Sequence, residues 1–589
     1  MKSAEKNHER VRIGPLDLSA DLIDLASVAR RTRYTGGMAP TAAVLAWTDW
    51  ALHLAYSPGK RLALWQDALR MQREFLQYSL TAALPHPAAE CVEPAEQDRR
   101  FADAAWHRWP FNLIQQAFLM QEKWWDLATT GVRGVSPHHE DMVNFAGRQW
   151  LDMISPANYI VTNPEVQQLT MQSAGMNLVQ GAMNAWDDAR RALTDEAPAG
   201  TEGFEVGRDV AVTPGKVVFS NRLIELIQYA PATSKVQAEP VLIVPSWIMK
   251  YYILDLSPHN SLVSYLVSRG HTVFIISWKN PDAGDRDLGM HDYRELGVMA
   301  ALDAVTGIVP DRKVQAVGYC LGGTLLSIAA AAMARDGDER LQSLSLLASE
   351  TDFRESGEIK LFVDESQLAW LEAGMWRKGY LEGWQMAGSF QMLNSQDLIW
   401  SRRVREYLMG DRRPLIDLMA WNADTTRMPY RMHSEYLRHI VMNNDLAEGR
   451  YLVDGRPVAV SDIRVPMFVV GTLRDHVAPW RSVYKIHLLN DSEITFALTS
   501  GGHNAGIVSE PGRPRRHHQI NTRPAGGNYV DPDRWLETAA SHDGSWWPSW
   551  DAWLKRQASD TAVAPPAMGG KDRKKVVMAD APGSYVMQR

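Results

Sequence analysis

Apolar residues in the first third of the chain recur at three- and four-residue steps, which is the spacing of amphipathic helices. Residues 43–56 and 61–80 show this spacing. It returns after residues 81–98, which carry three prolines and are typical of a linker. The pattern predicts a helical N-terminal extension over 1–100 and a second helical segment over 101–200.

From about residue 201 the pattern changes to short apolar runs rich in Val, Ile, Leu and Phe, which suit parallel strands buried on both faces. Helical stretches lie between these runs, so an α/β fold is predicted over 201–556. The six runs are 240–246, 271–278, 313–318, 341–348, 465–471 and 493–500.

Two segments depart from this alternation. More than 110 residues of helical sequence rich in Trp and Met, 352–464, separate the fourth run from the fifth. They are too long for a connection, which predicts an inserted cap over the C-terminal edge of the sheet. The last residues, 557–589, include APPAMGGKDRKK and are predicted to be disordered.

The sequence GYCLGG, residues 318–323, supplies the first candidate chemistry. It has the shape of a Gly-x-Ser-x-Gly nucleophile elbow, a sharp turn from strand to helix, with Cys320 in place of serine. A lone buried cysteine is usually a small apolar residue, but the elbow favours a nucleophile. We therefore predict an α/β-hydrolase fold in which the amide of Leu321 is one oxyanion donor. The second donor is expected after the first strand, near Trp247 and Ile248.

A cysteine nucleophile needs a base, and the base needs an orienting group. In this fold the acid and then the histidine follow the nucleophile along the chain. Asp475 follows the fifth run and His503 the sixth, so both leave strand ends at the elbow's edge of the sheet. We predict His503 as the base and Asp475 as the acid, with Asp352 as the alternative acid. His476 is interpreted as a structural hydrogen-bonding residue.

Composition narrows the class of function. The formal net charge of −7 argues against a nucleic-acid-binding protein. The chain has two cysteines, so a reducing compartment is expected and a disulfide framework is not. The N-terminal residues lack the apolar stretch of a secretory signal, and no apolar run has the roughly 20 residues that span a bilayer. We therefore expect a soluble cytoplasmic protein. We also expect no metal site, because the histidine pairs 138–139 and 517–518 lack metal-ligand spacing.

Several longer blocks resemble the polyhydroxyalkanoate synthases, and the length and helical N-terminal region are similar to those of class I. The blocks are TPGKVVFSNRLIELIQY (213–229), KYYILDLSPHNSLVSYLVSRGHTVFIISWKNP (250–281), GYCLGGT (318–324), VAPW (477–480), GGHNAGIV (501–508) and GSWWPSW (544–550). The resemblance implies an enzyme that polymerises (R)-3-hydroxyacyl-CoA, here 3-hydroxybutyryl-CoA, into a polyester and releases CoA without a cofactor. It places the catalytic cysteine, aspartate and histidine on Cys320, Asp475 and His503. It also implies a homodimer at the surface of polyester granules, with granule-associated proteins as partners.

The sequence departs from this family at some positions. Met249 stands where members of the family usually have asparagine, next to the expected oxyanion loop, and the loop 509–535 is longer than usual. A cysteine hydrolase that cleaves thioesters or esters with water is the alternative function, since the same triad would serve it. A non-catalytic protein that binds the granule surface is less favoured, because Cys320, Asp475 and His503 are all present.

Two further predictions concern binding. Arg513, Arg515 and Arg516 lie shortly after His503 and are candidates for binding the phosphates of CoA, with a solvated loop as the alternative. Residues 1–100 carry amphipathic stripes but none of the triad. They predict granule attachment or assembly, with a packed structural appendage as the alternative.

Overall fold

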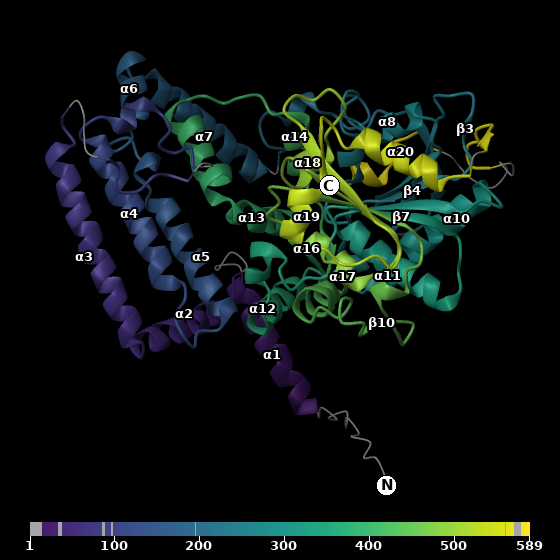
Figure 1. Ribbon diagram of the computed structural model, residues 1–589, viewed down its shortest axis with the longest axis horizontal. Helices are drawn as coiled ribbons and strands as arrows, with labels where there is room; N and C mark the ends of the chain where they lie inside the picture. Colours follow the sequence, from purple (N-terminus) through teal and green to yellow (C-terminus); the bar gives the residue numbers. More distant parts are fainter. Residues whose placement is uncertain are drawn as a thin grey trace, which may run out of the picture.

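The structure is a computed structural model that describes residues 15–32, 38–84, 89–95, 98–194, 196–559, 561–570 and 579–589. Two regions are visible in Figure 1: the helices of residues 40–194 lie on one side, and a sheet flanked by helices forms most of the rest. Among the helices of the described ranges, none combines the length and the apolar character that a membrane span requires.

The larger region is built on a ten-stranded sheet with the order β1-β2-β5-β4-β6-β7-β12-β13-β14-β15. The six central strands are parallel, and the two strands at each edge are antiparallel. The strands are β1 (Gly215–Ser220), β2 (Ile224–Tyr229), β4 (Val241–Val244), β5 (Val273–Trp278), β6 (Val314–Tyr319), β7 (Leu341–Leu347), β12 (Met467–Thr472), β13 (Ile494–Thr499), β14 (His517–Arg523) and β15 (Ala540–Asp543). The six apolar runs of the sequence correspond to the six central strands, whose residues are nearly all buried, as in other parallel sheets.

The sequence pattern does not predict the edge strands, and β2 shows why. Its sequence is IELIQY, so Glu225 and Gln228 interrupt the apolar run, yet all six residues are buried. The C-terminal segment supplies the hydrogen bonds that these two side chains need. Glu225 accepts from the amides of Ser584 and Tyr585 at 2.8 and 2.9 Å, and Gln228 accepts from the amide of Gly569 at 2.9 Å. The strand is therefore stabilised by contacts from a distant part of the chain.

The same contacts show that the C-terminal segment is ordered where the structure describes it, which differs from the disorder expected over 557–589. Strand β16 (Ala562–Val563) pairs with β3 (Val236–Gln237). The hydroxyl of Tyr585 donates to the carbonyl oxygen of Asn221 at 2.6 Å. The physical reason is that the segment brings hydrogen-bond donors to polar groups buried in the edge of the sheet. Residues 560 and 571–578 lie outside the described residues.

The predicted cap is confirmed as a mainly helical insertion between β7 and β12. Figure 1 shows α12 and α13 between the N-terminal helices and the sheet. The cap contains α12 (Glu365–Trp376), α13 (Gly383–Leu393), α14 (Asp417–Ala423), α15 (Tyr430–Glu435), the π-helical segments η9 (Gln396–Ser401), η10 (Val404–Leu408) and η11 (Tyr436–Met442), and the short strands β8 (Tyr380–Leu381), β9 (Met428–Pro429), β10 (Tyr451–Val453) and β11 (Arg456–Val458).

The remaining α-helices of the larger region lie between and after its strands. They are α8 (Leu262–Ser268), α9 (Met290–Asp292), α10 (Ala300–Ile308), α11 (Leu321–Asp336), α16 (Trp480–Tyr484), α17 (Ile486–Leu489), α18 (His503–Ile507), α19 (Pro532–Thr538) and α20 (Trp547–Gln557). Two of them, α11 and α18, carry the candidate site.

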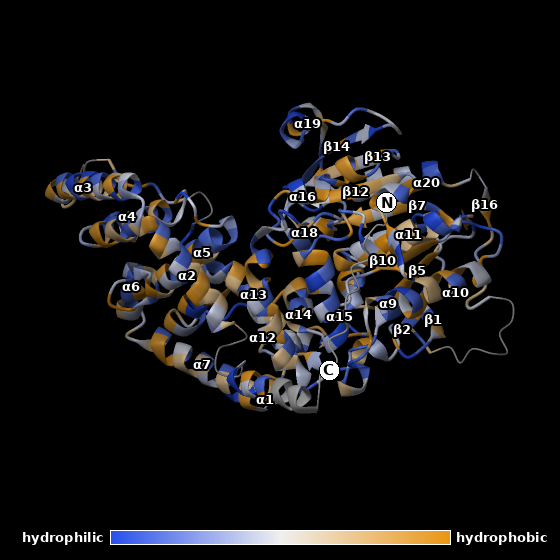
Figure 2. Ribbon diagram, turned by 90° about the horizontal axis from the view of Figure 1, so that it is seen from below, coloured by the Kyte–Doolittle hydropathy of each residue, from blue (hydrophilic) through white to orange (hydrophobic). Residues whose placement is uncertain are grey.

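The N-terminal helices pack on one another and on the cap. Helix α2 packs against α5 and α3 against α4, so helices on both sides of the boundary expected at residue 100 are in contact. Helix α1 contacts α12, and α7 contacts η10, so this region also supports the cap. Figure 2 shows α3 and α4 at the end of the molecule far from the sheet. The bounds are α1 (Pro15–Arg31), α2 (Pro40–Ala55), α3 (Pro58–Thr81), α4 (Phe111–Thr129), α5 (Pro137–Ile154), α6 (Pro164–Gln172) and α7 (Met176–Thr194).

Candidate active site

The turn between β6 and α11 holds the candidate nucleophile. Cys320 has a φ of 53° and a ψ of −128°, a backbone conformation that residues with a side chain rarely adopt. Gly318 and Gly322 allow the close approach that this turn requires. A Cβ on Gly322 would lie 2.2 Å from the carbonyl oxygen of Val244, and a Cβ on Gly318 would lie 2.2 Å from the Cα of Gly323. The sequence therefore forms the predicted elbow, with Cys320 at its tip.

His503 and Asp475 are hydrogen-bonded to each other at the same edge of the sheet. Asp475 follows β12, and His503 is the first residue of α18, after β13. The Nδ1 of His503 lies 2.8 Å from the Oδ2 of Asp475. Asp475 also accepts hydrogen bonds from the hydroxyl of Thr472 at 2.6 Å and from the amides of Val477 and Ala478 at 2.9 and 2.8 Å. Its side chain is 0% exposed, so a fixed carboxylate orients the imidazole.

The charges of these side chains are coupled. Burial alone lowers the pKa of His503, but the negative charges of Asp475 and Cys320, together with their hydrogen bonds, outweigh burial and hold that pKa well above 6.5. Burial alone raises the pKa of Asp475, but the charge and hydrogen bond of His503 and the hydrogen bond from Thr472 bring it below 3.8. The arrangement favours an imidazolium beside a carboxylate.

Asp352, the alternative acid, has different partners. Its Oδ1 accepts hydrogen bonds from the side-chain amide of Asn444 at 3.0 Å and from the backbone amide of Arg354 at 2.9 Å. These contacts anchor the chain where the cap begins. The structure therefore brings His503 together with Asp475. His476, which follows Asp475, is exposed.

Two amides next to the nucleophile can hold an oxyanion. Leu321 is the first residue of α11, where a backbone amide has no carbonyl group four residues earlier in the helix to bind. The amide of Ile248, in the loop after β4, lies 3.4 Å from the hydroxyl of Ser246, a long contact that leaves it able to bind a stronger acceptor. Met249 in the same loop forms a backbone bridge with Thr425 of the cap. This loop is therefore linked to the cap.

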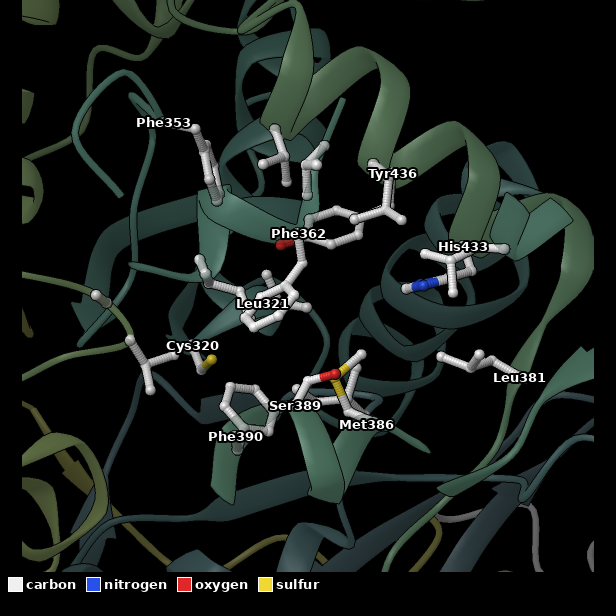
Figure 3. A pocket seen from close by; sticks show the side chains of 18 of the residues that line it. Cys320, Leu321, Phe353, Phe362, Leu381, Met386, Ser389, Phe390, His433 and Tyr436 are labelled. Carbon is white, nitrogen blue, oxygen red and sulfur yellow. The ribbon is translucent and has the colours of Figure 1, made fainter. Parts of the chain in front are cut away.

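Two cavities meet at Cys320. The first, of about 110 Å³, lies between the core and the cap, and most of its lining is apolar. Figure 3 shows Cys320 and Leu321 toward one end of this cavity and His433 at the other. The second cavity, of about 260 Å³, is lined by His503, His476 and Arg474 in addition to Cys320. An acyl group and a polar leaving group could thus approach the thiol from different cavities.

Besides Cys320, the first cavity has three lining residues with titratable side chains, and the sequence singles out none of them: Glu350, His433 and Tyr436. His433 is 2% exposed, and burial lowers its pKa to about 4, so its imidazole is neutral. Burial is the main reason that the pKa of Tyr436 is raised well above 10. No local motif marks these residues, because the packing of the cap brings two of them to the site. The one available signal is the position of Glu350 just after a predicted strand.

The arginines predicted to bind CoA are not among the residues that line either cavity. Arg513 donates to the carbonyl oxygen of Val508 at 2.9 Å, and Arg516 donates to that of Ser500 at 3.0 Å. Arg515 is exposed. Arg474, by contrast, lines the second cavity together with His503. A role of the three predicted arginines in binding phosphate stays a prediction.

Both cysteines are free thiols, Cys320 buried and Cys91 half-buried. Across the ranges that the structure describes, no group of three or more His, Cys, Asp and Glu side chains is placed to hold a metal ion.

The coupling of His503 to Asp475 predicts a pH-dependent difference in stability between the wild type and Asp475→Asn. The raised pKa of His503 stabilises the folded state fully below 6.5, its value before folding, and this contribution is lost as the pH rises through the folded value. The lowered pKa of Asp475 stabilises the folded state above 3.8, and that contribution is lost as the pH falls through the folded value. The difference in melting temperature should therefore be largest between about pH 4 and 6.5 and should shrink at higher pH. Thermal melts followed by circular dichroism measure it, and a difference that stays constant from about pH 5 to 10 would contradict the coupling.

Family models and a solved structure match different parts of the chain. The model described as "Poly-beta-hydroxybutyrate polymerase (PhaC) N-terminus" matches residues 97–266, and "Poly-beta-hydroxybutyrate polymerase N terminal" matches 19–60. The model "alpha/beta hydrolase fold" matches 239–510, in agreement with the observed fold. Among solved structures, a thioesterase domain from the curacin biosynthetic pathway is 14% identical, with a TM-score of 0.28, and the match covers 50% of this chain and 94% of that domain.

Two curated relatives match over most of their length. The poly(3-hydroxyalkanoate) polymerase of Methylorubrum extorquens is 39% identical over 532 residues, which cover 90% of this chain and 85% of the relative. The poly(3-hydroxyalkanoate) polymerase subunit PhaC of Cupriavidus necator is 38% identical over 526 residues, which cover 87% of each chain. The present chain belongs to the poly(3-hydroxyalkanoate) polymerase family.

Proposed function

We propose that this polymerase joins the acyl groups of (R)-3-hydroxyacyl-CoA, with 3-hydroxybutyryl-CoA as the expected monomer, and releases CoA. The proposal is carried by the position of Cys320, at the tip of the elbow and at the junction of two cavities. The hydrogen-bonded pair His503–Asp475 supplies the base and its orienting group. This arrangement suits a reaction that passes through an acyl-cysteine.

Acylation begins when the thiolate Sγ of Cys320 attacks the carbonyl carbon of the substrate thioester. The carbonyl oxygen becomes an oxyanion, which the amides of Leu321 and Ile248 bind. The bond from this carbon to the sulfur of CoA then breaks, and the CoA thiolate takes a proton from His503. One thioester has replaced another, so the acyl group stays activated for transfer. This is the advantage of a cysteine over a serine at the elbow.

Chain growth requires a 3-hydroxyl group to attack the acyl-cysteine. The hydroxyl oxygen forms an ester bond to the carbonyl carbon, the bond to Sγ breaks, and the hydroxyl proton passes to His503. Cys320 leaves as a thiolate beside an imidazolium. The lengthened chain is then the thioester of the CoA that carried the attacking hydroxyl, and it acylates Cys320 again with release of that CoA. Both oxygens of Asp475 already accept protein hydrogen bonds, and its side chain is 0% exposed. This supports a role for Asp475 through His503 rather than by direct contact with the hydroxyl.

The cap favours transfer to a hydroxyl over transfer to water. Apolar side chains from α13 and the nearby cap segments line the first cavity next to Cys320, among them Phe362, Met386 and Phe390 (Figure 3). An apolar enclosure keeps water from the activated acyl group. A cysteine hydrolase is the alternative function, because the same three side chains would support hydrolysis.

Purified protein incubated with (R)-3-hydroxybutyryl-CoA tests the proposal. The wild type should release CoA and form polymer together, measured as free thiol and as insoluble polyester. Cys320→Ser should keep less than about a tenth of the wild-type rate, because serine is a far weaker nucleophile near neutral pH. Cys91→Ser is the matched control and should keep the wild-type rate, because Cys91 does not line either cavity. Release of CoA with free 3-hydroxybutyrate would favour the hydrolase, and a larger residual rate in Cys320→Ser would remove Cys320 from the nucleophilic role.

An exposed apolar stripe on α3 supports the proposed location at the granule surface. Its residues lie three, four or seven positions apart and so share one helix face. On the opposite face, Leu64, Met71 and Tyr78 are buried. An unpartnered stripe of this kind suits an apolar surface such as solid polyester. The stripe consists of Leu62, Trp65, Leu69, Leu76 and Leu80, each more than 40% exposed.

The triple substitution Leu62→Ser, Leu69→Ser and Leu76→Ser should lower binding to polyester particles several-fold, because it removes most of the exposed apolar stripe. The fraction of protein that sediments with purified particles measures it. Gln72→Ser with Gln77→Ser, at exposed polar positions of the same helix, is the control and should bind as the wild type does. Unchanged sedimentation of the triple variant would contradict granule attachment through α3. Loss of a dimer with unchanged particle binding would instead assign the stripe to a second copy of the chain; the homodimer itself stays a prediction.

A further inference from the structure

Glu350 is a buried carboxylic acid in the wall of the first cavity. It follows β7, is 5% exposed, and lines the cavity together with Cys320 and Phe353. The carbonyl oxygen of Glu350 accepts a hydrogen bond from the hydroxyl of Thr324 at 2.8 Å, which fixes the backbone at this point. Glu350 is therefore part of the wall of the cavity that also contains the nucleophile.

The carboxyl group of Glu350 carries an unused hydrogen-bonding position. Its Oε1 is buried and has no hydrogen-bond partner among the residues that the structure describes. A buried polar atom without a partner is destabilising and rare in folded proteins. A ligand in the cavity that supplies the missing hydrogen bond would remove this cost. The unpaired atom is thus a reason to expect a polar group on the molecule that the cavity binds.

The surroundings of the carboxyl group favour its neutral form. Burial raises the pKa of Glu350 well above 4.5, hydrogen bonding with Ser482 opposes that shift, and the negative charges of Asp475 and Cys320 raise the pKa further. A neutral carboxyl group can both donate and accept a hydrogen bond. It also avoids the repulsion that a second negative charge would exert on the thiolate of Cys320.

The polar groups of the expected substrate limit what Glu350 can bind. In the proposed mechanism the carbonyl oxygen of the acyl group faces the amides of Leu321 and Ile248. The remaining polar group of a 3-hydroxyacyl thioester on this side is its hydroxyl, which donates and accepts. It therefore matches a neutral carboxyl group whichever of the two carboxyl oxygens carries the proton.

We propose that Glu350 hydrogen-bonds the 3-hydroxyl of the acyl group held at Cys320, and so selects 3-hydroxyacyl thioesters over unsubstituted acyl thioesters. This inference rests on the proposed function and assigns recognition of the 3-hydroxyl to Glu350. A site built to bind a hydroxyl disfavours an analogue that lacks it, because its own polar group is then left unpaired. Glu350 acts as a specificity residue, while the covalent chemistry stays with Cys320 and His503.

Single-turnover acylation tests the inference, with enzyme in excess over (R)-3-hydroxybutyryl-CoA or butyryl-CoA and with CoA release as the readout. Glu350→Met keeps the length of the side chain and removes both hydrogen-bonding atoms. It should slow acylation by the hydroxylated substrate about three- to tenfold, the usual effect of one hydrogen bond, and leave the rate with butyryl-CoA within about twofold. Glu350→Gln keeps a donor and an acceptor and should retain most of the preference for the hydroxylated substrate.

The possible outcomes separate this inference from the function on which it rests. If the wild type releases no CoA from (R)-3-hydroxybutyryl-CoA, the proposed function fails, and the inference fails with it. If the wild type is acylated but Glu350→Met slows both substrates equally, Glu350 is structural and the inference alone is overturned. An unchanged preference in Glu350→Met, or an equal loss of preference in Glu350→Gln, would overturn it as well. The butyryl-CoA rate serves in each variant as the measure of intact folding.

Discussion

The site depends on the backbone turn at Cys320, whose φ of 53° is unfavourable for a residue with a side chain. Close packing at the neighbouring glycines and a hydrogen bond from Ser349 stabilise that conformation. Glycines on either side let the start of α11 pack against β6 and the end of β4, with no room for a Cβ. The hydroxyl of Ser349 donates a hydrogen bond to the carbonyl oxygen of Cys320. The turn thereby presents the thiol and the amide of Leu321 at the same edge of the sheet where the other groups arrive.

The parallel strands explain why those groups meet. Strands β4, β6, β7, β12 and β13 run in the same direction, so their carboxyl ends lie along one edge. Ile248 follows β4, Glu350 follows β7, Asp475 follows β12 and His503 follows β13. The cap covers this edge and supplies the apolar wall of the first cavity. The polar groups of the site thus lie beside an apolar space, in which the proposed mechanism places the acyl group.

The sequence predicts the features that are encoded locally. The central strands follow from their apolar runs, the elbow from its glycines, and the pairing of Asp475 with His503 from their places after consecutive strands. The sequence does not predict features that depend on tertiary contacts. Strand β2 contains the buried Glu225, which is acceptable only because the C-terminal segment binds it, and that segment is ordered for the same reason. Glu350 and His433 likewise become candidate site residues only because the cap packs over the end of β7 and brings both into the lining of the first cavity.

The central claim is that the growing chain is carried on the sulfur of Cys320, and the most direct test is to locate the acyl group. The wild type would be mixed with (R)-3-hydroxybutyryl-CoA, quenched in acid within the first turnover, digested, and analysed by peptide mass spectrometry. The account predicts that the peptide containing Cys320 gains the mass of one 3-hydroxybutyryl group before any longer chain is found. Polymer formation with an unmodified Cys320 peptide at every quench time, or with the acyl group on another residue, would contradict it.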